Sequence, residues 1–142
     1  MAATDLNAVR ATIETRLKNE LGTNAPIVPV VFENVPYTPS AEKSWVYCVT
    51  SFGTSQYATL GGVTDSTGKI TGVITINIFT PQGQGIGAGL IIGKRIRDLY
   101  NRIIVSGVSF DSPIGPESLG FTESEAHFQS QIRVTFDVYE DL

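Results

Sequence analysis

Apolar residues recur at helical spacing in two segments of the chain. Thr4 or Asp5 can cap a first helix that runs to about Leu21, and Gly22 is placed to end it. The apolar stripe of this helix consists of Leu6, Val9, Ile13, Leu17 and Leu21. The second stripe, within residues 89–103, consists of Ile92, Ile96, Leu99 and Ile103. The spacing therefore predicts two amphipathic helices.

Alternation of apolar and polar residues predicts strands. Isoleucines alternate with Thr and Asn in residues 72–80, and Pro81 cannot donate to a sheet ladder, so this strand is expected to stop near Thr80. The clearest strand runs from Ala126 to Tyr139. It would span roughly 45 Å, whereas strands normally stop at about 10 residues. We therefore expect it to bend, or to overhang the sheet and pair elsewhere.

The remaining strands are less regular. Ile27 to Phe32 contains Pro29, which indicates an edge position. Trp45 to Phe52 is apolar on both faces, which implies a cover on each side from helices or from another subunit. Gly53-Thr54 is expected to turn the chain into a further strand up to Leu60.

The order of these elements predicts the fold class. Gly61 to Gly68 is expected to be a mobile loop, and Asp111 to Ser124 irregular surface. The chain then reads as helix, three or four strands, helix and two strands. This order predicts a single α+β domain over residues 1–142, with a mainly antiparallel or mixed sheet and two helices packed on one face.

Composition narrows the classes of function. A formal net charge of −4 argues against a nucleic-acid grip based on overall positive potential. Cys48 is the single cysteine, so no intramolecular disulfide is possible and a reduced compartment is the simpler assumption. Because neither a signal peptide nor an apolar run of about 20 residues is recognisable, the sequence predicts a soluble protein made in the cytoplasm.

The sharpest motif lies between the 72–80 strand and the second helix. Gly83, Gly85 and Gly87 belong to the segment Gly83–Ala88, which matches the dinucleotide fingerprint G-x-G-x-x-G/A. Such glycines let backbone amides approach a pyrophosphate at a helix N-terminus. The alternating strand before it and Pro81 weaken the match. The two interpretations are a nucleotide-binding loop and a flexible corner.

The other candidate groups have structural explanations. His127 is interpreted as an exposed surface histidine and Cys48 as a buried structural thiol. An acidic cluster, Glu117, Glu123 and Glu125 beside Asp111, is interpreted as a solvated loop. The cations of the second helix, Lys94, Arg95, Arg97 and Arg102, favour its C-terminal end because of the helix dipole. We therefore predict no catalytic residue, no metal site and no cofactor.

Several segments together resemble a known family. They are RLKNEL in the first helix, PVVFENVPYTPSAEKSWVYCVTSFG, GVITINIFTPQGQG running into GLIIGKRIRDLYN, and FQSQIRVTFDVYE near the C-terminus. In this order they resemble the tail terminator-like proteins of long-tailed (siphophage-type) bacteriophages. The resemblance implies a virion structural protein rather than an enzyme.

The resemblance also implies partners. Proteins of this kind form a ring, usually a hexamer, that caps the head-proximal end of the tail tube, ends tube polymerisation and joins the head through a neck or head-completion protein. DNA passes through the lumen in transit, and no membrane is involved. A neck or head-completion protein, a tail tube protein and a small nucleotide-binding enzyme using Gly83–Ala88 remain as alternatives.

We expect the assembly contacts to involve the second face of the 45–52 strand, the glycine corner and the long last strand. The interface candidates are Trp45, Tyr47, Phe79, Gly83, Gly85, Gly87, Phe128, Arg133, Phe136 and Tyr139. Phe128 to Tyr139 is expected to extend the sheet across a subunit boundary by strand pairing. The loops Gly61–Gly68 and Pro81–Gly89 are expected to become ordered on binding the tube or neck.

Overall fold

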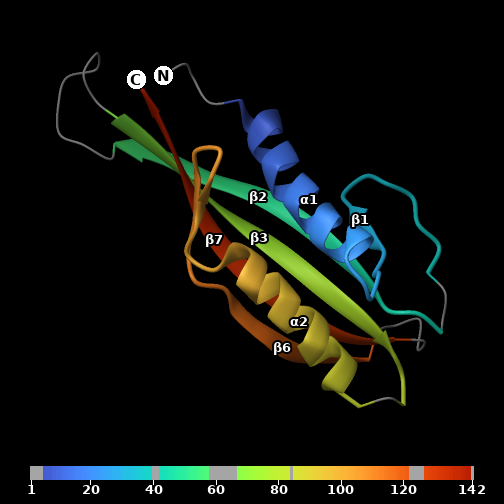
Figure 1. Cartoon of the computed structure of the whole chain (residues 1–142). Coiled ribbons are helices and arrows are strands. Elements are labelled where there is room, and N and C mark those ends of the chain that lie inside the picture. Colours follow the sequence, from blue (N-terminus) through green and yellow to red (C-terminus); the bar gives the residue numbers. More distant parts are fainter. Residues whose placement is uncertain (1–4, 40–41, 58–66, 84, 122–126, 142) are drawn as a thin grey trace.

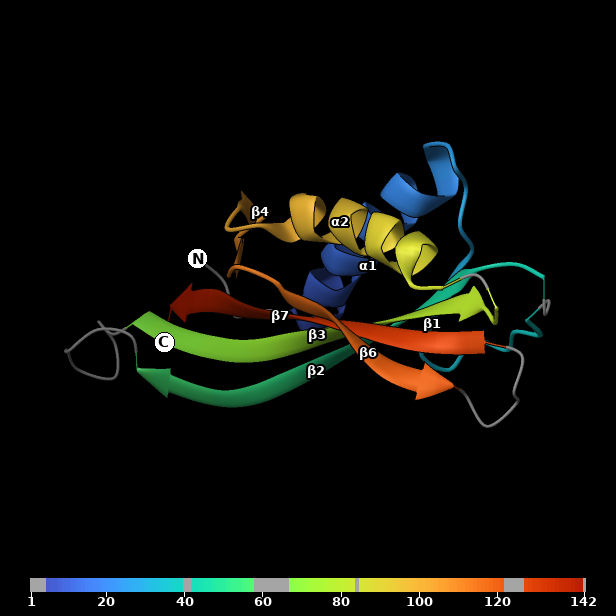
Figure 2. The ribbon, with the colours of Figure 1, turned by 90° about the horizontal axis from the view of Figure 1, so that it is seen from below.

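The structure, a computed structural model, describes residues 5–39, 42–57, 67–83, 85–121 and 127–141. In chain order its elements are α1 (Leu6–Thr23), β1 (Val30–Phe32), β2 (Trp45–Tyr57), β3 (Thr67–Pro81), α2 (Gly87–Tyr100), β4 (Ile104–Val105), β5 (Val108–Phe110), β6 (Ile114–Phe121) and β7 (His127–Asp141). Four strands follow α2, where the sequence predicted two. The elements form two layers, with both helices on one face of a curled sheet (Figures 1 and 2). The predicted α+β class is confirmed.

The sheet has the strand order β1-β2-β3-β7-β5-β4, and β6 also pairs with β7. β1 is parallel to β2, and the other pairs are antiparallel, so the sheet is mixed. β1 follows Pro29 and lies at the edge, as predicted. No helix in the described part of the chain is long and apolar enough to cross a membrane.

The first helix begins where the sequence predicted and ends later. The Asp5 carboxylate accepts hydrogen bonds from the amides of Asn7 and Ala8, at 2.9 and 3.3 Å, which satisfies two of the free donors of the first turn. At the other end Gly22 lies inside the helix, which continues to Thr23 with Asn24 as its C-cap. The prediction that Gly22 ends the helix was therefore wrong.

The long strand β7 does not overhang the sheet. β3 begins at Thr67, earlier than predicted, and pairs with β7 along its whole length, from Thr67 opposite Asp141 to Pro81 opposite His127. The opposite side of β7 pairs with β6 and β5. Since both sides are already bonded, the expectation that Phe128–Tyr139 pairs across a subunit boundary was wrong. The strand bends together with the sheet, the other expected possibility (Figure 2).

Two local expectations fail for the same reason, the close pairing of neighbouring strands. Gly53 does not turn the chain, because β2 continues to Tyr57 with a register shift between Phe52 and Ser55. A Cβ at Gly53 would lie 2.9 Å from the Thr71 carbonyl oxygen, so glycine lets the two backbones approach at this bulge. The segment 114–121 is the strand β6 rather than irregular surface, although its pairing with β7 is interrupted by two register shifts.

The hydrophobic core lies between the helices and the sheet. It is lined by the helix residues Val9, Ile13, Leu17, Leu21, Ile92 and Ile96, and by strand residues that include Val46, Ile74, Ile76, Ile78, Ile132, Val134 and Phe136. Tyr100 is fully buried, and its hydroxyl donates to the carbonyl of Ile13 at 2.7 Å. The helical stripes therefore do cover the sheet, except that Leu6 is 44% exposed.

Candidate assembly surfaces

The turn between β3 and α2 uses glycines in left-handed backbone. Gly83 has φ +84° and Gly85 φ +72°, conformations that other residues rarely adopt. Gly87 is the first residue of α2, and the N-cap residue Ile86 makes no side-chain capping hydrogen bond. All these residues are exposed. The glycines reverse the chain between sheet and helix.

The setting of this turn differs from that of a dinucleotide fingerprint. In nucleotide-binding folds such glycines follow a strand of a parallel sheet. Here β3 is antiparallel to both of its neighbours, and β1 with β2 is the parallel pair of the described sheet. Gly83–Ala88 therefore matches the fingerprint in sequence, but the strand before it is not part of a parallel sheet as in nucleotide-binding folds.

The N-terminal half of α2 carries an exposed apolar surface. Ile86, Leu90 and Ile91 are 53%, 48% and 63% exposed, and Ile27 beside them is 66% exposed. We call these four residues the α2 apolar surface. A groove of about 620 Å³ runs between Ile91 and the segment around Ile27. No charged residue occurs in the chain between Lys69 and Lys94, and Lys43 is the one charged residue among the described residues that line the groove. The surface is therefore mainly apolar.

A second, smaller hollow lies on the other side of the glycine turn. Its volume is about 270 Å³, and it is lined by Ile86, Gly83, Gly85 and the rings of Phe121 and Phe128. These two rings meet edge to face, with centroids 5.6 Å apart. Phe121 is 71% exposed, which is unusual for a large aromatic side chain. The glycine turn is thus bordered by apolar surface on both sides.

The sheet face opposite the helices carries aromatic side chains at one end. Trp45 stacks on Phe79 with centroids 4.3 Å apart and an interplanar angle of 14°. Tyr37 packs on Trp45 from the preceding loop, at 5.2 Å. The side chains of Trp45 and Phe79 are only partly buried, and no helix of the described chain covers this face (Figure 2). We call it the open sheet face.

His127 belongs to this aromatic cluster, contrary to prediction. Its side chain is only 2% exposed, because the rings of Trp45 and Phe79 lie edge-on to it. Its Nε2 lies 3.0 Å from the carbonyl oxygen of Lys43. The prediction that His127 is exposed was therefore wrong. The residue is buried and connects the start of β7 to the segment just before β2.

Polar side chains follow the aromatic cluster along the open sheet face. The Asn77 Oδ1 accepts hydrogen bonds from Gln129 and Gln131, at 2.9 and 3.0 Å. Further along, Arg133 pairs with Glu117 at 3.4 Å, with both side chains about half exposed. The face therefore combines apolar contact area with hydrogen-bonding groups. No group of three His, Cys, Asp or Glu in the described residues could hold a metal ion.

Comparison with protein families identifies the chain. The family model described as phage tail terminator protein matches residues 8–110. The chain belongs to this family. This match confirms the resemblance to tail terminator proteins inferred from the sequence. The family is one of structural proteins of the phage tail and not of enzymes. Membership of this family indicates a structural role in the tail of the virion.

The structural comparison supports the fold alone. One solved structure, of a protein whose name states no function, superimposes with a TM-score of 0.70 over 96% of each chain, at 18% sequence identity. No curated protein sequence matches significantly. The fold of this tail terminator therefore occurs in a protein of very different sequence.

The structure separates the predicted interface candidates. Trp45, Tyr47, Phe79 and Arg133 lie on the open sheet face, partly buried or exposed, and Tyr139 is 42% exposed. Gly83, Gly85 and Gly87 form the corner beside the α2 apolar surface, and Phe128 lines the smaller hollow. Phe136 is fully buried, so its side chain contributes to the core. Residues 61–66 of the predicted loop, Thr4, Glu123 and Glu125 lie outside the described residues.

The residues that sequence reasoning missed are the exposed apolar ones. Leu90 and Ile91 stand next to Ile92 in one apolar run, and only Ile92 fits the buried stripe. This surplus of apolar residues on a helix was the available signal. Ile114, Leu119 and Phe121 were missed because β6 was not recognised as a strand.

Two of the cations of α2 bind other segments of the chain. The Arg95 guanidinium donates to the carbonyls of Glu20, Asn24 and Pro26 at 2.7–3.0 Å and pairs with the Glu20 carboxylate at 3.3 Å. Arg97 donates to the carbonyls of Pro113 and Gly115. Both therefore hold neighbouring segments to α2, a role that goes beyond the helix dipole. Cys48 is buried as predicted, and burial raises the pKa of its thiol to about 12.

Proposed function

We propose that this chain forms a ring, a hexamer as in related terminators, that caps the head-proximal end of a phage tail tube. The ring ends polymerisation of the tube protein and offers its other face to a neck or head-completion protein. DNA crosses its lumen only in transit. The protein is made in the host cytoplasm and becomes part of the virion tail. Membership of the tail terminator family is the observation that carries the proposal.

The exposed surfaces support this role physically. Soluble monomers rarely leave large apolar patches uncovered, and those that they expose often mark protein interfaces. The α2 apolar surface and the open sheet face lie on different sides of the molecule. A ring subunit needs at least two such surfaces, one for its neighbours and one for a partner along the tail.

The test is a tube-capping assay with the tube protein of the same phage. Tubes are grown in vitro with and without the purified chain, and their lengths are measured by electron microscopy. We expect shorter tubes that carry a closed ring at one end, and a native mass of a closed ring in solution or on the tube. Tubes that grow to the same length without an end ring would contradict the proposal.

Other outcomes identify the alternatives. Fibres formed by the chain alone would indicate a tube protein, and binding to the head connector without an effect on tube length a neck protein. Calorimetric titration with NAD and ATP tests the nucleotide alternative, for which the antiparallel setting of the glycine turn gives no support.

A further inference from the structure

The outer edge of β2 is only partly covered by the chain itself. β1 pairs with β2 from Val46 to Cys48. Over the described residues, no strand pairs with the outer side of β2 beyond Cys48. The inner side remains paired with β3 as far as Tyr57. Ser51–Tyr57 is therefore a sheet edge, and about half of its backbone groups face outward.

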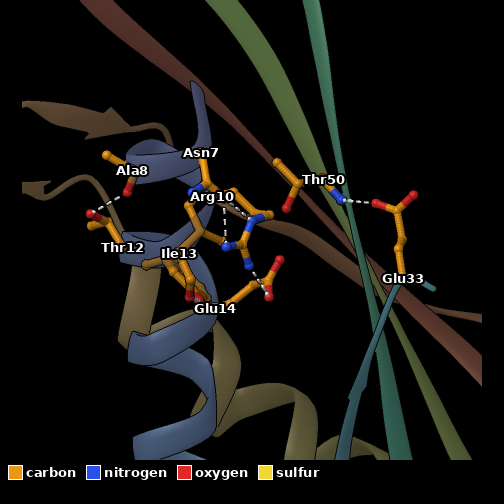
Figure 3. A network of polar contacts seen from close by, with 9 residues as sticks. Asn7, Ala8, Arg10, Thr12, Ile13, Glu14, Glu33 and Thr50 are labelled. Atoms are coloured by element: carbon orange, nitrogen blue, oxygen red, sulfur yellow. Dashed lines mark hydrogen bonds and ion pairs between the residues drawn. The ribbon is translucent and has the colours of Figure 1, made fainter. Parts of the chain in front are cut away.

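The first outward amide of β2 beyond the end of β1 donates its hydrogen bond to a side chain. The Val46 amide donates to the carbonyl oxygen of Pro29, with an N–O distance of 2.9 Å. Every second amide of β2 after Val46, as far as the register shift, therefore points to the outer side. The Thr50 amide is one of these, and the Glu33 carboxylate accepts its hydrogen bond at 3.0 Å (Figure 3). The Glu33 carboxylate thus accepts the hydrogen bond that a longer β1 would accept. The chain offers no such cap for Ser51–Tyr57 in its described part.

This edge lacks most of the usual protection against strand pairing. Proteins protect edge strands with charged residues, proline, bulges or short length. No charged residue and no proline occurs between Lys43 and Asp65. The register shift between Phe52 and Ser55 bends the edge, but β2 remains paired with β3 on both sides of it. By contrast, β1 has three residues and follows Pro29, and β4 has two.

A second free edge lies at the opposite border of the sheet. In the described structure β6 pairs with β7 only, so its outer side is unpaired. It exposes Ile114 (53%), Leu119 (50%) and Phe121 (71%). β6 adjoins the half of β7 that includes Phe128, whereas the free part of β2 pairs with the other half of β3. The two edges lie diagonally across the sheet, and they are unlike, as a head-to-tail contact requires.

We propose that the outer edge of β2, Ser51–Tyr57, pairs with the outer edge of β6 in a second copy of this chain. Backbone hydrogen bonds then continue the sheet from one subunit into the next. The contact also covers the exposed apolar side chains of β6. The inference rests on the proposed ring function, because it names the contact by which the ring closes.

Cysteine pairs test this contact in the full-length chain. Ser51→Cys, Thr54→Cys and Gln56→Cys are each combined with Leu119→Cys, because facing residues on paired strands have Cβ atoms about 4.5–5.5 Å apart. The three positions test three registers of the pairing. Rings and capped tubes are oxidised and analysed on denaturing gels. We expect at least one pair to yield a ladder of cross-linked oligomers. The control combines Leu119→Cys on β6 with Lys18→Cys, an exposed position on α1. This pair should not cross-link, so the protein should remain monomeric on the gel.

A charge variant gives a second readout. Thr54→Lys with Gln56→Lys places two like charges on each β2 edge, where both side chains are exposed. We expect loss of the ring mass in native mass spectrometry with an unchanged melting temperature of the monomer, while Asn19→Lys on α1 leaves the ring intact. If the unmodified chain forms rings and caps tubes, but no pair cross-links above the control and the charge variant still assembles, the inference is wrong and the proposed function stands. If the unmodified chain forms neither rings nor caps, both are wrong.

Discussion

Among the glycines in the described part of the chain, Gly72 is the one at which an added Cβ has least room. A Cβ at this position would lie 2.3 Å from Phe136 Cζ and 2.7 Å from the carbonyl oxygen of Ser51. The ring could shift, but the carbonyl belongs to the paired strand β2 and cannot move freely. We expect Gly72→Ala to lower the free energy of unfolding by about 1–3 kcal/mol, measured by urea denaturation.

Gly22→Ala is the matched control. This glycine lies inside α1, and a Cβ there would meet nothing within 4 Å. Alanine in a helix interior is favoured over glycine by about 0.5–1 kcal/mol, and Gly22 is the last residue but one of α1, so this variant should be more stable than the unmodified chain by at most that amount. If both variants had the same effect, the crowding around Gly72 would not be its cause.

Cys48 makes stability depend on alkaline pH. Burial raises the pKa of its thiol from 9.0 to about 12, so the unfolded chain loses this proton at a lower pH than the folded chain. The contribution of the thiol to the free energy of unfolding is therefore fully present below pH 9. It falls as the pH rises from 9 towards 12, by up to about 1.4 kcal/mol per pH unit. Burial also raises the pKa of Tyr100, which adds to the decline.

Cys48→Ala isolates the contribution of the thiol. We expect this variant to start less stable, but to lose stability less steeply between pH 9 and 10.5 in urea denaturation experiments. Equal slopes for the two proteins would show that ionisation of the thiol does not contribute. Tyr100 is present in both proteins, but the charge of Cys48 also raises its pKa, so the difference in slope includes this coupling.

Single residues were predictable where the sequence neighbourhood decides their environment. Cys48 alternates with apolar residues in one strand and is buried, as expected. His127 lies on the same face of its strand as Gln129 and Gln131 and was expected to be exposed, but its cover comes from Trp45 and Phe79, which only the sheet brings next to it. Contacts of this kind depend on strand register, which alternation within one strand does not determine.

At the scale of elements, Arg95 holds the end of α1 to α2. It donates to three carbonyls and pairs with Glu20, with its side chain 15% exposed. Arg95→Ala would leave these acceptors without their donor, so we expect a loss of about 1.5–3 kcal/mol in the free energy of unfolding. Arg95→Lys should recover only part of this, because an ammonium group cannot reproduce the planar fork.

The adjacent Lys94 provides a control on the same helix. Its pair with Asp98 is 72% and 60% exposed, and such pairs contribute less than about 0.5 kcal/mol. Lys94→Ala should therefore leave the melting temperature nearly unchanged. An equally large effect of both alanine variants would indicate that the charge of α2, and not the bonds of Arg95, stabilises the helix pair.

Element prediction succeeded where periodicity is strong. Both helices and the strands β3 and β7 have long regular patterns, and their existence and type were predicted correctly. β6 was missed because Pro116, Gly115 and Gly120 break its alternation, and its pairing with β7 compensates for this weak local preference. The predicted turn at Gly53 failed because a glycine that permits a bulge and a glycine that permits a turn look alike in sequence.

At the scale of the whole molecule, one sheet face is covered by helices and the other is not. Trp45 to Phe52 was expected to need a cover on each face, and the chain supplies helices on one only. The sequence could predict the need for a second cover but not its source. The assembly surfaces could be predicted only in part, because exposure of residues such as Ile91 and Phe121 depends on how the layers pack.

Ile91 provides the sharpest test of the α2 apolar surface. Its side chain is 63% exposed, so Ile91→Glu should change the free energy of unfolding by no more than about 0.5 kcal/mol. A carboxylate at this position would have to be desolvated when a protein partner covers the surface, and the exposed Lys43, which lines the same groove, offsets only part of this cost. We therefore expect Ile91→Glu to keep the monomer melting temperature and to lose tube capping. Ile104→Glu, which places the same charge at a 75% exposed isoleucine on β4, should retain capping. Capping by both variants would show that the partners of the chain do not dock on α2, and loss in both would attribute the effect to added negative charge.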